Sequence, residues 1–208
     1  MIAIIDYDAG NTFNVQKALD YIGLDAVLTA DPDVILNADG VLLPGVGAYA
    51  SAVAVLKERG LVDVIYEVVK REIPLLGICL GMQLLFDESE EYGPTPGLGL
   101  IPGKVKEIPR DLGLRVPHMG WNKNVVHHPD SAFSNVDDQY TYFVHSYYVD
   151  TEPEYIISTA NYGVDVPGVV ERGRVYGMQF HPEKSGVVGL NLLRAFGNIT
   201  EAYGAAKK

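Results

Sequence analysis

The first half of the chain alternates short apolar runs with segments of helical periodicity, and this alternation constrains the fold more than any other feature. The apolar runs at residues 2–5, 24–29, 40–43 and 75–78 have the length and composition of buried strands. Parallel strands joined by crossover helices are covered on both faces and show this form. The pattern therefore predicts an α/β domain around a mostly parallel central sheet.

Helical periodicity fills the segments between these strands. Before the first helix, Gly10 and Asn11 are placed to turn the chain and cap the helix, and Gly23 is placed to end it. The apolar face of this helix consists of Val15, Ala18, Leu19 and Ile22. The predicted helices cover about residues 12–22, 50–57 and 61–70, and a fourth begins within residues 80–86.

The second half carries shorter apolar segments separated by Pro and Gly, which favours antiparallel strands. Residues 171–174 are predicted to form a hairpin turn. The predicted strands are 104–108, 139–149, 155–160, 169–171 and 174–180, and a closing helix at 189–198 carries Leu190, Leu193 and Phe196 to the core. The expected architecture is a three-layer α/β fold, with a mostly parallel central sheet flanked by helices and additional antiparallel strands in the second half.

Length and charge narrow the class of partner. A chain of 208 residues suits one large domain, and we expect residues 1–208 to form it. The net charge of −11 would repel nucleic acid and anionic membranes, so a small molecule or a protein is the expected partner.

The longest apolar run, residues 73–86, is too short to span a membrane. With one cysteine and no basic leader, the chain is expected in the cytoplasm.

The only cysteine, Cys79, stands between Gly77 and Gly81 directly after a predicted strand. Strand, glycine-flanked nucleophile and helix is the arrangement of a nucleophile elbow. Such a turn places the thiol at the C-terminal edge of a parallel sheet and at a helix N-terminus, which favours the thiolate. A buried structural cysteine accounts for this short pattern equally well.

A base for this thiol is predicted at His181, in the sequence FHPEKS near the C-terminal end of the chain. Pro182 turns the chain after a strand, and Glu183 is placed to fix the tautomer of the imidazole. Cys79, His181 and Glu183 would then form a Cys-His-Glu triad. An exposed turn at a strand end also fits these residues, because spacing alone does not show that the two segments meet.

A glycine-rich segment, PGVG, follows the third predicted strand. Its backbone N–H groups at Val46 and Gly47, together with that of Leu80, are predicted to form an oxyanion hole. A plain connecting loop is the alternative.

Other candidate groups are assigned structural roles. Adjacent histidines in a strand point to opposite faces, so His127 and His128 are not expected to share a metal ion, and no metal site is predicted. His118 is interpreted as a packing or interface residue, and His145 as structural or substrate-adjacent. The acidic run at residues 87–91 is predicted to be a solvated helix end.

The segments PGVG, GICLGMQLL and FHPEKS, in this order and spacing, resemble the class I glutamine amidotransferases. DYDAGN, PHMGWN and YFVHSYY are similar to segments of one family in that class, the glutaminase subunits of imidazole glycerol phosphate synthases. The resemblance implies hydrolysis of L-glutamine to glutamate and ammonia by a Cys-His-Glu triad without a cofactor. It also implies that Gln83, Glu91, Ser146 and Tyr147 bind glutamine.

The resemblance further implies a partner, the separate (β/α)₈-barrel cyclase subunit of a heterodimer in histidine biosynthesis. That subunit combines the ammonia with a nucleotide to give imidazole glycerol phosphate and aminoimidazole carboxamide ribotide. The positions that match the partner interface are Asn11, Asn14, Trp121 and Lys184. Asp8 departs from the family pattern, in which Gly is expected, and adds a negative charge near the expected interface.

Two other functions fit the sequence. One is the glutaminase subunit of a different synthase, for anthranilate or pyridoxal phosphate, although PHMGWN favours the histidine pathway. The other is a non-catalytic binding module that keeps the fold, and the intact triad residues argue against it.

Overall fold

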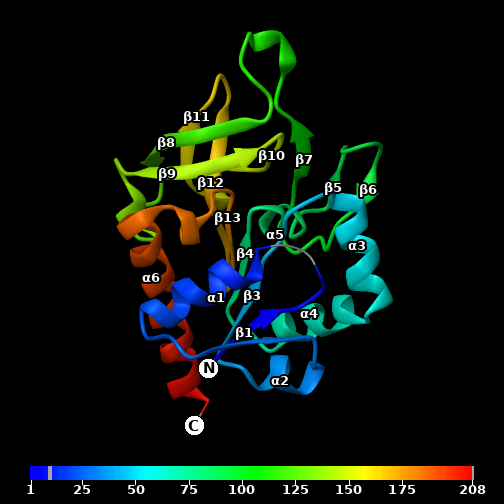
Figure 1. The fold of residues 1–208 in the computed structure, drawn as a ribbon, viewed down its shortest axis with the longest axis vertical. Helices are drawn as coiled ribbons and strands as arrows, with labels where there is room; N and C mark the ends of the chain where they lie inside the picture. The colour runs from blue at the N-terminus through cyan, green and yellow to red at the C-terminus, as the bar shows by residue number, and fades with distance from the viewer. Residues whose placement is uncertain (9–10, 208) are drawn as a thin grey trace.

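The computed structural model describes residues 1–8 and 11–207, and its centre is a nine-stranded mixed sheet (Figure 1). The predicted α/β architecture is confirmed. In spatial order the strands are β2 (Ala26–Thr29), β1 (Ile2–Ile5), β3 (Gly40–Leu43), β4 (Leu75–Ile78), β13 (Val175–Met178), β12 (Asp165–Arg172), β11 (Ile156–Asn161), β8 (His118–Val126) and β9 (Tyr140–His145).

Helices cover both faces of the parallel part of this sheet, which comprises β2, β1, β3, β4 and β13. Because side chains alternate along a strand, Ile4 faces one helical layer and Ile5 the other. The first layer contains α1 (Thr12–Tyr21) and α6 (Gly186–Ala206), and the second contains α2 (Pro32–Asn37), α3 (Tyr49–Glu58) and α4 (Leu61–Lys70). All residues of β1, β3 and β4 are consequently buried.

The second half of the chain adds antiparallel strands to this sheet. β12 and β13 form the predicted hairpin, with Gly173 at a φ of 59° in the turn. A second sheet has the order β10 (Tyr147–Asp150), β7 (Lys104–Glu107), β5 (Glu88–Ser89) and β6 (Thr95–Pro96). Single-turn helices are η1 (Arg110–Leu112), η2 (Ser134–Val136), η3 (Pro153–Tyr155) and η4 (Pro182–Lys184).

Several predicted elements need correction. The strand predicted at residues 139–149 is two strands, because the chain leaves the large sheet after β9 and joins the small sheet as β10, with Ser146 between them. The helix predicted within residues 80–86 is only α5 (Leu80–Gln83). The acidic run is not a helix end, because it contains β5, in which Ser89 is buried.

Two elements longer than four residues were absent from the prediction. The nine-residue strand β8 buries His118 and Asn124 instead of an alternating apolar set, so its sequence lacks the period of a half-buried strand. α2 is short, but it has a recognisable start: Pro32 follows Asp31, whose side chain accepts a hydrogen bond from Asp33 N at 2.9 Å.

The closing helix and the first helix also differ from their predictions. α6 extends well beyond residues 189–198 at both ends, and it carries Leu193 and Phe196 into the core while Leu190 is only partly buried. Asn11 precedes α1, but its side chain makes no capping hydrogen bond, and Gly10 lies outside the described residues. Within residues 1–8 and 11–207, no helix combines the length and apolar composition that crossing a bilayer requires.

Candidate active site

Cys79 occupies the sharp turn between β4 and α5, with φ of 56° and ψ of −112°. These angles are strained for a non-glycine residue, and such strain concentrates at functional sites. The flanking glycines permit the turn: a Cβ on Gly81 would lie 1.8 Å from the Leu43 carbonyl oxygen, and one on Gly77 would lie 2.6 Å from the Gly81 carbonyl oxygen. The predicted elbow geometry is therefore present. Because α5 has only four residues, its macrodipole is small.

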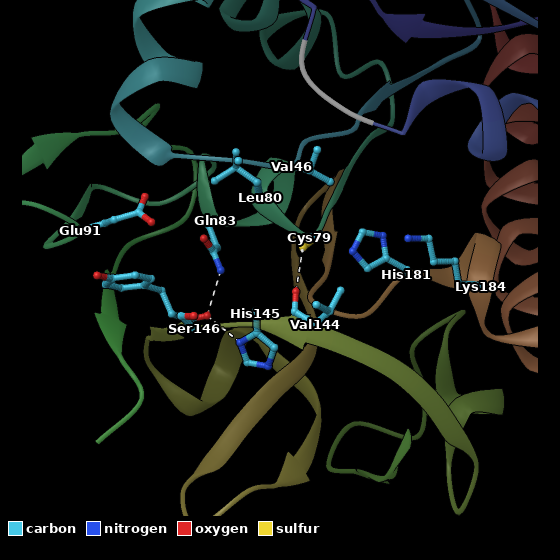
Figure 2. A pocket seen from close by; sticks show the side chains of 12 residues that line it. Val46, Cys79, Leu80, Gln83, Glu91, Val144, His145, Ser146, His181 and Lys184 are labelled. Atoms are coloured by element: carbon cyan, nitrogen blue, oxygen red, sulfur yellow. Dashed lines mark hydrogen bonds between the residues drawn. The ribbon is translucent and has the colours of Figure 1, made fainter. Parts of the chain in front are cut away.

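His181 follows β13, the strand that pairs in parallel with the Cys79 strand β4. Its backbone N–H donates to the Tyr142 carbonyl at 3.0 Å, and its Nδ1 donates to Glu183 Oε1 at 2.8 Å. Both side chains are almost fully buried. The imidazole is turned toward Cys79 (Figure 2). With Nδ1 engaged by the carboxylate, Nε2 is the nitrogen left for the thiol.

The charge state of His181 is set by three influences. Burial alone would lower its pKa, but hydrogen bonds to Cys79 and Glu183, and the charges of both, outweigh burial and raise the pKa to about 9. The imidazolium form is thus favoured at neutral pH. The Cys79 sulfur lies 3.9 Å from the Val144 carbonyl oxygen and 3.9 Å from Gln179 Nε2. The structure therefore brings the three predicted triad residues together.

The environment of Glu183 was not foreseen. Its Oε1 also accepts a hydrogen bond from Asn11 Nδ2 at 3.4 Å, which links the start of α1 to the carboxylate. Its Oε2 is buried and has no hydrogen-bond partner among the described residues. This oxygen borders a cavity of about 10 Å³ that Asn11 also lines, which is about the smallest volume that holds one water molecule.

A pocket of about 320 Å³ opens beside Cys79, where the ends of β4 and β13 meet the β9–β10 junction (Figure 2). Its volume suits a small polar ligand such as an amino acid. It contains all the residues that were expected to bind glutamine and two of the three triad residues. It also contains His145, which was interpreted as structural or substrate-adjacent, and Val144, which sequence reasoning did not assign. The lining residues are Val46, Gly47, Cys79, Leu80, Gln83, Glu91, Val144, His145, Ser146, Tyr147, His181 and Lys184.

Two of the expected glutamine-binding residues are held by hydrogen bonds from their own fold. Gln83 Nε2 donates to the Tyr147 carbonyl at 2.9 Å and to Gln179 Oε1 at 3.1 Å. Glu91 Oε2 accepts from the backbone N–H of Tyr49 at 2.6 Å, at the N-terminus of α3. These contacts fix the polar wall of the pocket before any ligand enters.

The PGVG loop lies against the elbow, as expected from the pairing of β3 with β4. Leu80 N–H donates to the Gly45 carbonyl at 3.3 Å, so in this arrangement that donor faces the loop. Gly47 has a φ of 100°, which glycine adopts readily. The Tyr7 hydroxyl donates to the Pro44 carbonyl at 2.6 Å, and burial, then the charge of Cys79, raises the pKa of Tyr7 and keeps this donor protonated.

The residues expected at a partner interface lie near the pocket or on the exposed face of β8. Asn14 is exposed on the first turn of α1 and donates to Asn11, and Lys184 in η4 lines the pocket. Trp121 in β8 is 54% exposed, with its ring 5.9 Å from that of Tyr142. Neither Asn14 nor Trp121 lines the pocket.

The departure at Asp8 has a structural context. Asp8 has a φ of 60°, in the left-handed region where glycine is favoured and Asp is tolerated. Its carboxylate forms an ion pair with Arg59. The backbone conformation explains why glycine is expected at this position.

The remaining histidines divide into two groups. His127 contacts Thr159 and His128 contacts the Pro153 carbonyl, so the adjacent pair does not converge. His118 and His145 are buried and contact each other. Across the part of the chain that the structure describes, no three His, Cys, Asp or Glu side chains are grouped to hold a metal ion.

The sequence and the fold match known proteins. Residues 3–197 match the model of the family described as glutamine amidotransferase class-I, so the chain belongs to that family. A crystal structure of a glutamine amidotransferase superposes with a TM-score of 0.76 at 19% identity, and covers 97% of this chain and 100% of its own.

Within the family, the chain is similar to curated proteins named imidazole glycerol phosphate synthase subunit HisH. The protein from Lactiplantibacillus plantarum is 54% identical over 202 residues, with 97% of both chains covered. That from Listeria monocytogenes is 50% identical over 200 residues, with 96% of both covered.

Proposed function

We propose that this chain is the glutaminase subunit of an imidazole glycerol phosphate synthase, which hydrolyses L-glutamine to glutamate and supplies ammonia for histidine biosynthesis. The observation that carries the proposal is the identity of about half of all residues, over nearly the whole length, with the HisH subunits. The position of Cys79 and His181 in one pocket, with Glu183 hydrogen-bonded to His181, supports the chemistry. No cofactor takes part in it.

The reaction begins with attack of the Cys79 thiolate on the side-chain carboxamide carbon of glutamine. The tetrahedral intermediate collapses with cleavage of the C–N bond, and the His181 imidazolium gives its proton to the departing ammonia. A γ-glutamyl thioester remains on Cys79. Water then loses a proton to His181, attacks the thioester and releases glutamate. Glu183 holds Nδ1–H, so that Nε2 serves both proton transfers.

Glutamine is held by Gln83, Glu91, Ser146 and Tyr147 in this proposal. One oxygen of the Glu91 carboxylate is used by Tyr49 N, and the other remains to accept from the α-ammonium group. Ser146 offers a hydroxyl at the junction between the two sheets. The wall is held in place because Gln83 is hydrogen-bonded to the Tyr147 carbonyl in β10, and Glu91 to the N-terminus of α3.

The oxyanion hole requires a change in the PGVG loop. Leu80 N–H is directed at Gly45 O, so the loop must move before Val46 or Gly47 and Leu80 can offer N–H donors to the developing oxyanion. We propose that partner binding drives this rearrangement, and that the isolated chain hydrolyses glutamine slowly. Fast hydrolysis by the isolated chain would contradict this coupling.

The partner is proposed to be a (β/α)₈-barrel cyclase subunit in a heterodimer, contacted through Asn11, Asn14, Trp121 and Lys184. Direct transfer of ammonia has a chemical reason: in water at neutral pH ammonia is mostly protonated, and ammonium is not a nucleophile. The lone free thiol of Cys79 suits a reducing compartment, so we propose that the protein works in the cytoplasm.

The test is glutamate release measured with the chain alone and with a purified histidine-pathway cyclase subunit and its nucleotide substrate. We expect strong stimulation by the cyclase, and a loss of at least about 10⁴-fold in rate for Cys79→Ala. Stimulation by an anthranilate or pyridoxal phosphate synthase partner instead would reassign the pathway. No glutamate release with any partner would indicate a non-catalytic module.

A further inference from the structure

A buried pair of histidines behind the glutamine pocket has no part in the proposed chemistry. His145 lines the pocket, and its side chain is almost completely buried; His118, behind it, is fully buried. Their rings meet edge to face with centroids 4.9 Å apart, and His118 Nδ1 lies 2.9 Å from His145 Nε2. Buried polar side chains of this kind are retained for the hydrogen bonds that they make.

The tautomer of His145 follows from its surroundings. His145 Nδ1 lies 2.7 Å from the Tyr147 carbonyl oxygen, which can only accept, so the proton must be on Nδ1. Burial lowers the pKa of His145 to about 3, and the ring therefore carries this single proton at neutral pH. His145 is a fixed donor to Tyr147.

The same conclusion holds when the whole pair is considered. His118 Nε2 lies 2.8 Å from Asn122 Oδ1, so the pair has three hydrogen-bonding contacts. Two neutral imidazoles carry only two N–H groups. The Asn122 side-chain amide can turn and donate to His118 Nε2, whereas the Tyr147 backbone carbonyl can only accept, so the two N–H groups go to the Tyr147 contact and to the contact between the rings.

His118 holds the ring of His145 in place. The His118 ring is stacked between Phe143, at a centroid distance of 5.1 Å, and Tyr162, at 3.8 Å. A ring clamped on both faces cannot swing away, so His145 is confined between His118 and the Tyr147 carbonyl.

The Tyr147 carbonyl has a second donor, Gln83 Nε2, at 2.9 Å (Figure 2). The other hydrogen of this amide nitrogen goes to Gln179 Oε1 at 3.1 Å. Both hydrogens of the Gln83 amide nitrogen are therefore held by buried acceptors, and the carbonyl oxygen of the same amide is left for the pocket.

We propose that His145 is a positioning residue for glutamine binding: it holds the Tyr147 carbonyl where that group fixes the amide of Gln83, so that Gln83 presents an acceptor to the substrate. The inference rests on the proposed function. Without the Nδ1–H donor, the Tyr147 carbonyl can shift, and the side-chain amide of Gln83 can then rotate. The rotated amide presents its N–H groups to a substrate group that is itself a hydrogen-bond donor, so the hydrogen bond to the substrate is lost.

The test uses glutamine binding without turnover, measured by isothermal titration calorimetry in a Cys79→Ala background. His145→Leu removes the donor but keeps a similar side-chain volume, whereas His145→Asn is smaller but can place its Nδ2–H where Nδ1–H was. We expect Leu to weaken glutamine binding about tenfold and Asn to stay within about twofold of the parent. A control variant, His127→Leu, changes a histidine outside the pocket and should bind as the parent does.

Parental affinity for His145→Leu, or a loss for Asn as large as that for Leu or larger, would overturn the inference, because a packing role gives the smaller Asn no advantage over Leu. Thermal unfolding checks that each variant is folded. If His145→Leu does not fold, Gln179→Met removes the second acceptor of Gln83 and should weaken binding several-fold; parental affinity there also overturns the inference. Absence of glutamine binding in the Cys79→Ala parent would instead count against the proposed function.

Discussion

The parallel and antiparallel parts of the sheet are built on different principles. The buried strands β1, β3 and β4 contain only apolar residues and glycine, and they carry Cys79 on a turn at their edge. The strands β8, β9 and β11 bury polar side chains, among them His118, Asn124 and Ser158. One part is held by apolar burial, and the other also by hydrogen bonds that have no apolar substitute.

This difference matters for the site, because the pocket lies between the two parts. The parallel part supplies the nucleophile and its strained turn. It also supplies His181, which follows β13, whereas the antiparallel part supplies the β9–β10 junction with Ser146 and Tyr147. Variants on the two sides should therefore fail in different ways, and five predictions test this, in order of expected effect.

The largest effect is expected for Gly81→Ala at the elbow. Its Cβ would lie 1.8 Å from the Leu43 carbonyl oxygen, a backbone atom that cannot move without disturbing β3. We expect a loss of more than about 4 kcal/mol in the free energy of unfolding, measured by urea denaturation. The matched control is Gly60→Ala, where φ is 68° but no atom lies within 4 Å, and a cost of about 1 kcal/mol is expected.

The second largest loss of stability is expected when a substitution creates a cavity in the parallel part. Leu42 in β3 is fully buried, so Leu42→Ala should cost about 2–5 kcal/mol in the free energy of unfolding. Leu42→Met keeps the volume and should cost less than about 1.5 kcal/mol. If the two variants are equally unstable, this part of the core depends on more than volume and burial.

The third prediction concerns pH. The folded pKa of His181 is raised to about 9, above the ordinary value of 6.5, so the protonated ring stabilises the fold. This contribution, about 3 kcal/mol, is complete below pH 6.5 and is lost as pH rises through 9. Urea denaturation at pH 6, 7.5 and 9.5 should show the decline in wild type and a smaller one in His181→Gln. If the free energy of unfolding declines equally with pH in both proteins, the prediction for His181 is contradicted.

A smaller effect is expected for Asn124→Leu in the antiparallel part. Asn124 Nδ2 donates to Thr141 Oγ1 at 2.9 Å and to the Gln139 carbonyl at 3.2 Å, across β8 and β9. Leu has a similar volume but leaves these buried groups without a partner, so we expect a loss of about 1–3 kcal/mol in unfolding free energy. A neutral result would mean that the buried polar groups of this part are not needed for its stability.

The smallest effect on stability is expected for Trp121→Ala, because the side chain is more than half exposed. The free energy of unfolding should change by less than about 0.5 kcal/mol. If Trp121 contacts the partner as proposed, the concentration of cyclase subunit that gives half-maximal glutaminase stimulation should rise about tenfold or more. Val125→Ala, another exposed residue of β8, is the control and should leave stimulation unchanged.

Sequence reasoning predicted some elements and site residues correctly and missed others. β1, β3 and β4 were predicted with correct bounds because an apolar run bounded by turns leaves few alternatives. Val144 was missed as a pocket residue, and His145 was interpreted only as structural or substrate-adjacent, because both precede Ser146, where the chain changes sheets, and no local pattern marks that change. The sequence did contain one indication that Gln179 lies near the site, because Gln179 stands two residues before His181 in the same segment.

By itself, the sequence determined the parallel strands, the glycine-flanked turn at Cys79 and the candidate base, because these depend on local sterics and on apolar periodicity. Only the tertiary structure decided that residues 102 positions apart share a pocket, that β8 buries a histidine, and that Leu80 N–H faces Gly45. Those features depend on hydrogen bonds between distant strands. The partners of a buried polar group come from the whole fold, and its neighbours in sequence do not specify them.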